Sequence, residues 1–169
     1  MLIAMFTSSY EVLKVLGRGS FGQVVRAYDH KSQRWVAVKI VRSEDRFRRQ
    51  AHDEVRTLSL LLRADIDDQY HIVRMLDHFE FRRHQCIVFE QLGIDLYEAL
   101  KRRDFRGLPL TAARQAAFGI TRCLALLRRH GIIHCDLKPE NVLLTLPPSR
   151  PVHAYNINVK VFCKFSFNF

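Results

Sequence analysis

Residues 132–141 read Ile-Ile-His-Cys-Asp-Leu-Lys-Pro-Glu-Asn, and this segment places three polar side chains of different chemistry close together. Transfer of a phosphoryl group to a hydroxyl needs a carboxylate that orients the hydroxyl and accepts its proton, a role that suits Asp136. It also needs a cation near the transferred phosphate, which suits Lys138, and an amide oxygen on a metal ion, which suits Asn141. The alternative is a polar turn around Lys138 and Pro139 without chemistry. The order and spacing of the side chains favour phosphoryl transfer.

A glycine-rich segment lies near the N-terminus, between two segments of strand-like composition. Glycines let backbone N–H groups approach phosphate oxygens closely, because no Cβ intervenes and positive φ is accessible. A dinucleotide-binding turn has similar glycines but leads into a helix, whereas a strand is expected here. A tight glycine hairpin without a ligand is the other alternative. The predicted phosphate-binding residues are Leu16, Gly17, Arg18, Gly19, Ser20, Phe21, Gly22, Gln23 and Val24, the last placed to cover a ring.

One lysine, Lys39, lies in the otherwise apolar run Val-Ala-Val-Lys. On a buried strand a lone ammonium group needs a carboxylate or phosphate partner, because an unpaired buried charge is costly. Glu54 follows fifteen residues later, in the middle of an expected helix, and is the natural partner. Such a pair would direct Lys39 at the α- and β-phosphates of a nucleotide. The alternative is an edge strand from which Lys39 reaches solvent.

The elements that must position these residues follow from periodicity. Alternating and β-branched residues predict strands at residues 10–16, 23–28, 35–41, 72–81, 85–89, 142–145 and 158–161. Helical spacing predicts a helix from Ser43 to about Leu62, and further helices at residues 95–103 and 111–129. The last of these has its apolar side at Ala113, Ala116, Ala117, Ile120, Leu124 and Leu127. The pattern predicts an α+β fold, with a small antiparallel sheet and one helix followed by a helical region, and Gly93 as a hinge.

The composition narrows the class of protein. The chain has 169 residues, of which 48% are hydrophobic, and a formal net charge of +10, which favours anionic partners. A nucleic-acid binder is disfavoured, because no stripe of alternating arginine and aromatic residues occurs. The four cysteines have no metal-binding spacing and are expected to be reduced thiols. No segment is apolar for long enough to cross a membrane, so we expect a soluble cytoplasmic and/or nuclear protein with no membrane partner.

The strings LGRGSFGQVVRAYDH, VAVK, VFEQL and IIHCDLKPENVLL resemble the dual-specificity tyrosine-regulated kinases, the DYRK family, over roughly residues 10–145. The resemblance implies a protein-kinase-like fold with a complete N-lobe at residues 10–92 and an incomplete helical C-lobe at residues 93–161. A short segment (1–9) precedes them and a Phe-rich tail (162–169) follows. The resemblance also implies ATP and Mg²⁺ as cofactors. It further implies protein substrates that are phosphorylated on Ser or Thr, together with tyrosine autophosphorylation. Nothing in the sequence indicates an oligomeric state.

The same resemblance assigns the adenine site. Phe89 resembles the gatekeeper, and Glu90 to Leu92 resemble the hinge that hydrogen-bonds adenine. Ala37 and Leu143 resemble the ceiling and the floor of the adenine slot. Cys135 stands where most kinases have an arginine that grips a phosphate on the activation loop. A thiol cannot do so, and control through that contact should be absent.

The chain departs from the family pattern after the run Val159-Lys160-Val161. The family places there an aspartate that holds magnesium on the β- and γ-phosphates, but Phe162 and Cys163 follow, and the only acid after Asp136 is Glu140. The activation loop and the later C-lobe helices are also expected to be missing. We therefore expect slow phosphoryl transfer, and the alternative function is a nucleotide- or partner-binding kinase fragment without catalysis.

Overall fold

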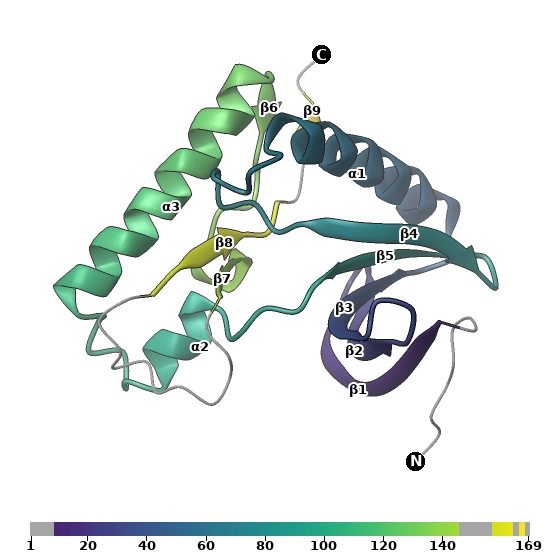
Figure 1. The fold of residues 1–169 in the computed structure, drawn as a ribbon, viewed down its shortest axis with the longest axis horizontal. Helices are drawn as coiled ribbons and strands as arrows, with labels where there is room; N and C mark the ends of the chain where they lie inside the picture. The colour runs from purple at the N-terminus through teal and green to yellow at the C-terminus, as the bar shows by residue number, and fades with distance from the viewer. Residues whose placement is uncertain (1–8, 146–156, 164–165, 168–169) are drawn as a thin grey trace. The chain divides into compact units, whose positions relative to one another are not determined.

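A computed structural model describes residues 9–145, 157–163 and 166–167. The chain divides into two compact units. Unit 1 comprises Met1–Leu62 and Arg74–Gln91, and unit 2 comprises Arg63–Val73 and Leu92–Phe169 (Figure 1). The division falls within the segment predicted as a hinge, between Gln91 and Leu92. The domain boundaries at residues 9, 92 and 161 stay a prediction.

Unit 1 is built on a five-stranded sheet in the order β1-β2-β3-β5-β4. Its antiparallel pairing was predicted from the sequence, whereas the order of the strands was not. The strands are β1 (Tyr10–Gly19), β2 (Gly22–Asp29), β3 (Arg34–Val41), β4 (Met75–Phe81) and β5 (His84–Glu90). Several strand boundaries differ from the predicted ones. β1 and β2 continue into the glycine-rich segment, so that only Ser20 and Phe21 separate them, and β4 begins at Met75 rather than Ile72. Ile72 instead makes an isolated parallel bridge with Val161.

The two faces of β3 have different surroundings, since successive side chains point to opposite faces. Val36, Val38 and Ile40 are buried in an apolar cluster with Tyr10 and Val25 of the neighbouring strands. Lys39, on the other face, bonds to helix α1. That helix spans Asp45–Ala64, and its buried face consists of Ala51, Glu54, Val55, Thr57, Leu58 and Leu61. The alternation therefore directs Lys39 away from the cluster and toward α1.

The described part of unit 2 contains two α-helices and two small antiparallel sheets, β6 with β9 and β7 with β8. Helix α2 begins after Asp95, whose carboxylate accepts a hydrogen bond from the Glu98 N–H at 2.8 Å, a side-chain N-cap. The predicted helix at residues 95–103 is thus confirmed but ends earlier. The elements are α2 (Leu96–Lys101), α3 (Leu110–Arg129), β6 (Ile132–Ile133), the 3₁₀ turn η1 (Pro139–Asn141), β7 (Val142–Leu144), β8 (Val159–Val161) and β9 (Ser166–Phe167). The turn expected at residues 146–151 lies outside the described residues.

The buried face of α3 includes Ala116 and Leu127 of the predicted apolar side but differs from it elsewhere. Ala113, Ala117 and Leu124 are exposed, and the buried residues are Ala112, Ala116, Gly119, Cys123, Leu126 and Leu127. A Cβ added to Gly119 would lie 2.7 Å from a methyl group of Val159, so the glycine lets α3 approach β8 closely. The prediction was wrong at the other positions because apolar residues occupy several sides of this helix, and periodicity alone cannot choose between adjacent stripes.

Residues 65–73 are fixed to β8 by long-range polar contacts. The Lys160 ammonium, 6% exposed, pairs with the Asp68 carboxylate. The His71 ring bonds through Nδ1 to the Val159 carbonyl at 2.9 Å, and backbone bonds join Val73 and His71 to Val161. These contacts explain why this segment belongs to unit 2 although it lies between two elements of unit 1.

All four cysteines are free thiols, as predicted. Cys86, Cys123 and Cys163 are buried, and burial raises the pKa of the Cys86 thiol to about 12. Cys135 is exposed. None of the described helices combines the length and apolar character needed to cross a bilayer.

Candidate active site

The glycine-rich segment of unit 1 forms the turn of the β1–β2 hairpin, with Gly19 opposite Gly22. Gly22 has a φ of +145°, and a Cβ there would lie 2.1 Å from the Ile40 carbonyl oxygen, so only glycine fits. Because β2 follows the turn, the segment is not a dinucleotide-binding strand-to-helix turn. Val24 pairs with Lys39 in the β2–β3 register, which brings the hairpin beside the lysine.

Lys39 and Glu54 form a buried ion pair. The Lys39 Nζ lies 2.7 Å from both carboxylate oxygens of Glu54, and the two side chains are 4% and 10% exposed. β3 lies between β2 and β5, so the alternative of an edge strand is wrong. The predicted pairing is therefore confirmed. A charge pair this well enclosed is held in one geometry, as a phosphate-directing lysine requires.

The Phe21 ring covers the lysine, with its centroid 4.8 Å from Lys39 Nζ. The same ring packs against Gly19, where an added Cβ would lie 2.8 Å from it. A cation over an aromatic face is attracted to the ring electrons. The absence of a Cβ at Gly19 therefore allows the Phe21 ring to pack against the hairpin and over Lys39.

The remaining predicted adenine-site residues of unit 1 lie on β3 and β5. Ala37 is opposite Phe89 in the β3–β5 register, and Phe89 is 3% exposed. The Glu90 carboxylate accepts a hydrogen bond from the Arg74 N–H at 2.8 Å, which fixes the end of β5. In unit 2, Leu92 is buried and Leu143, on β7, is half-buried and pairs with Lys160.

Asp136, Lys138 and Asn141 converge in unit 2. The Lys138 Nζ lies 3.0 Å from one Asp136 carboxylate oxygen. The Asn141 amide donates to the other oxygen at 3.1 Å and to the Asp136 backbone carbonyl at 2.7 Å. The Asp136 and Lys138 side chains are 30% and 42% exposed, so the cluster is open to solvent. The structure therefore brings together the three side chains that the sequence grouped.

His134 contacts this cluster through the Asp136 backbone N–H. It was not singled out from the sequence. Its Nε2 lies 3.1 Å from the Phe162 carbonyl oxygen, which can only accept, so Nε2 carries a proton. Its Nδ1 accepts from the Asp136 N–H at 3.3 Å, and the ring is therefore neutral. Burial lowers the pKa of His134, against smaller raising effects from the Phe162 carbonyl and the Asp136 charge. The signal available in the sequence was a histidine two residues before Asp136.

The stability of unit 2 is expected to fall in acid because of His134. A histidine with a lowered native pKa binds more protons when unfolded, so its contribution is present above the unfolded pKa of 6.5 and is lost as pH falls below it. The measurement is the free energy of urea unfolding, followed by circular dichroism, between about pH 8 and about pH 5. His134→Gln should flatten this profile, whereas His130→Gln, at an exposed position, should leave it as in wild type. An unchanged profile in His134→Gln would contradict the assignment.

The described residues fit a metal ion only partly. The two hydrogen bonds from the Asn141 amide nitrogen leave its oxygen as the atom that can hold a cation. Phe162 and Cys163 follow β8, and the Cys163 Sγ, buried, lies 3.8 Å from the Cys123 Sγ. Among the described residues, no three His, Cys, Asp or Glu side chains form a metal-binding group. A magnesium ion would thus depend on nucleotide phosphates and water for most of its ligands.

Residues 10–154 match the protein kinase domain family. The dual specificity tyrosine-phosphorylation-regulated kinase mbk-2 of Caenorhabditis elegans is 56% identical over 135 residues, which cover 80% of this chain and 16% of that protein. The putative dual specificity tyrosine-phosphorylation-regulated kinase 3 homolog of Drosophila melanogaster is 53% identical, with coverage of 80% and 16%. The human dual specificity tyrosine-phosphorylation-regulated kinase 3 is 50% identical, with coverage of 80% and 23%.

These relatives confirm the resemblance of the chain to the DYRK kinases. The chain spans about a sixth to a quarter of the length of the curated relatives it matches. The match to the kinase family covers most of the chain and includes the glycine-rich hairpin, the Lys39–Glu54 pair and the Asp136 cluster. The chain belongs to the protein kinase domain family.

Proposed function

We propose that unit 1 binds ATP, with the nucleotide phosphates at Lys39 beneath the glycine-rich hairpin. The observation that carries this proposal is the buried Lys39–Glu54 pair, held 2.7 Å apart beside a hairpin whose turn admits only glycine at position 22. Within unit 1, Leu16, Val24 and Ala37 would enclose the adenine ring, Phe89 would act as gatekeeper, and the segment that begins at Glu90 would bond to its edge.

We further propose that the Asp136 cluster serves transfer of the γ-phosphate to Ser, Thr or Tyr hydroxyls of protein substrates. Asp136 would orient the hydroxyl and accept its proton, and Lys138, 3.0 Å away, would offset charge on the transferred group. His134 would hold the Asp136 backbone in place through its ring nitrogen. Mg²⁺, bound with ATP, would neutralise the phosphates, and Asn141 would hold it through its amide oxygen. A location in the cytoplasm and/or nucleus suits such substrates.

A second candidate function is nucleotide binding with little transfer. It is favoured by the absence of a carboxylate at residues 162 and 163, where Phe and Cys follow β8. Under this proposal the chain would hold ATP, or a protein partner, through the same unit 1 residues. The two functions share the nucleotide site and differ in the metal site alone.

ATP is expected to stabilise unit 1, and Lys39→Ala is expected to remove most of that effect. Ligand at about 100 times its dissociation constant adds about 2.7 kcal/mol to the free energy of unfolding, which a thermal shift assay resolves. Lys31→Ala, at an exposed position outside the proposed site, is the matched control and should respond to ATP as wild type does. Equal stabilisation of wild type and Lys39→Ala would show that the phosphates do not bind at Lys39.

A further inference from the structure

Two of the four cysteines lie side by side in the core of unit 2. Cys123 belongs to α3, and Cys163 comes two residues after the end of β8. Their Sγ atoms are 3.8 Å apart, although 40 residues separate them in the sequence. The close approach of β8 to α3 at Gly119 brings the two segments together (Figure 1). The proposed function assigns a role to neither thiol.

The hydrogen bonds of the two thiols direct one sulfur atom at the other. The Cys163 S–H donates to the Val161 carbonyl at 3.7 Å, since a carbonyl can only accept. The Cys163 sulfur therefore accepts in its contact with Cys123, whose S–H points toward it. A disulfide needs the two sulfur atoms about 2.0 Å apart, so small movements of the two side chains have to close a remaining distance of about 2 Å.

The other two cysteines have different surroundings. Cys86 is buried on β5 of unit 1, and its thiol bonds to the His84 carbonyl at 3.8 Å. Cys135 is exposed, and its thiol bonds to the Ile133 carbonyl at 3.7 Å. Within the described ranges, Cys123 and Cys163 are the one pair of cysteines whose sulfur atoms are in contact. The structure therefore selects a single disulfide out of the possible pairings.

Burial restricts which oxidant can reach this pair. Cys123 and Cys163 are 0% and 2% exposed, so a bulky disulfide cannot approach them, whereas hydrogen peroxide is little larger than water. Buried thiols react slowly, and the first oxidation needs local opening of the segment that follows β8. The second thiol is already in contact with the first, so the bond between them then closes at a high effective concentration.

We propose that Cys123 and Cys163 are a modification site at which hydrogen peroxide forms an intrachain disulfide. The Cys163 sulfur, the less enclosed of the two, attacks a peroxide oxygen, the O–O bond breaks, and a sulfenic acid and water form. The Cys123 sulfur then attacks the sulfenic sulfur, the S–O bond breaks, and the hydroxyl leaves as water with the Cys123 proton. Two thiols thus lose two electrons and two protons, and one peroxide is reduced to two waters.

The disulfide would join α3 to the segment that contacts the Asp136 cluster. Phe162, next to Cys163, donates its N–H to the Asn141 carbonyl at 2.8 Å. The Phe162 carbonyl accepts from the His134 ring at 3.1 Å. Oxidation is therefore expected to hold both of these contacts more firmly. Its effect on phosphoryl transfer rests on the proposed function, whereas formation of the disulfide does not.

The test is peptide mapping of the folded 169-residue chain after treatment with hydrogen peroxide. Treatment continues well beyond the point at which exposed Cys135 is oxidised, the remaining thiols are blocked in acid-denatured protein, and the digest is analysed by mass spectrometry without reduction. One peptide that joins Cys123 to Cys163 is expected. Oxidation of the unfolded chain in urea is the control, because all four thiols are then exposed and mixed pairings should form.

Urea unfolding of the oxidised and reduced forms, followed by circular dichroism, measures the effect on unit 2. Oxidation should raise the midpoint by about 1 M in wild type, because a disulfide that closes a long loop restricts the unfolded chain. Cys86→Ala, which also removes a buried thiol, is the matched control and should keep this shift, whereas Cys123→Ala should lose it. Unlinked Cys123 and Cys163 after oxidation of Cys135, or an equal shift in Cys123→Ala, would overturn the proposal.

Discussion

Glu54→Gln is expected to lower the free energy of unfolding of unit 1 by about 3–5 kcal/mol, the usual cost of leaving one partner of a buried ion pair without the other. Lys39 is 3% exposed, and its ammonium group lies within 2.7 Å of both Glu54 oxygens. A neutral amide offers one acceptor instead of two and no charge. Trp35, the only tryptophan of the chain, lies on β3, so its fluorescence during urea unfolding reports on unit 1 alone.

Two other variants separate the ion pair from general effects of losing an acid. Glu44→Gln removes a carboxylate that is 51% exposed and pairs with Arg42 and Arg46, and it should cost no more than about 1 kcal/mol. The double variant Lys39→Met with Glu54→Leu should recover most of the lost stability, because apolar residues can replace a buried ion pair. It should not recover ATP binding. A cost for Glu54→Gln as small as that of Glu44→Gln would mean that the pair is solvated.

The parts of the site that the sequence predicted are those set by local pattern. Strand alternation in residues 35–41 and helical spacing around Ala51, Val55 and Leu58 place Lys39 and Glu54 on facing surfaces, and the buried pair follows. Asp136, Lys138 and Asn141 lie within six residues, so one loop brings them together. In both cases the spacing of the residues in the sequence is enough to predict which side chains come together.

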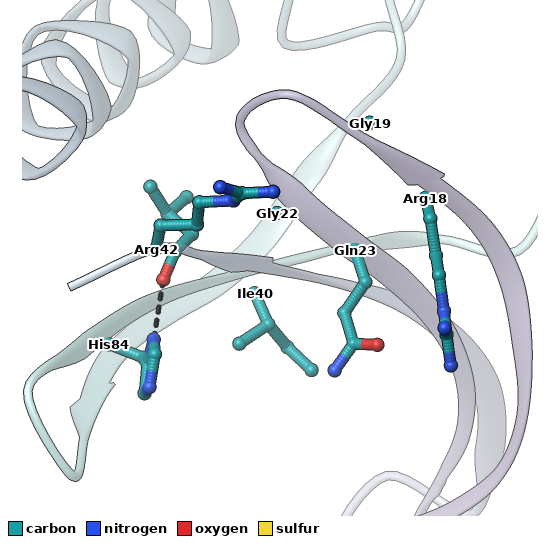
Figure 2. A pocket seen from close by; sticks show the side chains of 8 residues that line it. Arg18, Gly19, Gly22, Gln23, Ile40, Arg42 and His84 are labelled. Carbon is teal, nitrogen blue, oxygen red and sulfur yellow. Dashed lines mark hydrogen bonds between the residues drawn. The ribbon is translucent and has the colours of Figure 1, made fainter. Parts of the chain in front are cut away.

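The features that the sequence did not predict depend on contacts between distant segments. Which stripe of α3 is buried is decided by β8, through the close approach of Val159 to Gly119. His84, at the start of β5, bonds to the Val41 carbonyl across 43 residues of sequence (Figure 2). The tautomer of His134 depends on the Phe162 carbonyl, 28 residues away. No periodicity encodes such pairings, because each is fixed by the tertiary structure.

Phosphoryl transfer by the 169-residue polypeptide is expected to be very slow even when ATP binds. The physical reason is electrostatic. Charge that develops on the β- and γ-phosphates is normally neutralised by a metal ion held on carboxylates, and in this chain Phe162 and Cys163 follow β8 while Asn141 supplies one amide oxygen. Phosphate incorporation into a generic Ser/Thr peptide, measured with labelled ATP and Mg²⁺, should therefore be close to background, although the thermal shift with ATP persists.

The Asp136→Asn variant distinguishes genuine phosphoryl transfer from background. An asparagine at position 136 can still accept a hydrogen bond from Lys138. Its amide group would, however, face the Asn141 amide nitrogen, which lies 3.1 Å from the Asp136 carboxylate in wild type. An amide also cannot take a proton from a hydroxyl. Loss of a general base typically costs about 10²–10⁴-fold in rate, so any genuine transfer should vanish in this variant. Robust transfer by wild type that Asp136→Asn abolishes would contradict the expectation. Glu140→Gln would then show whether that acid, the only one in the sequence after Asp136, supplies the missing metal ligand.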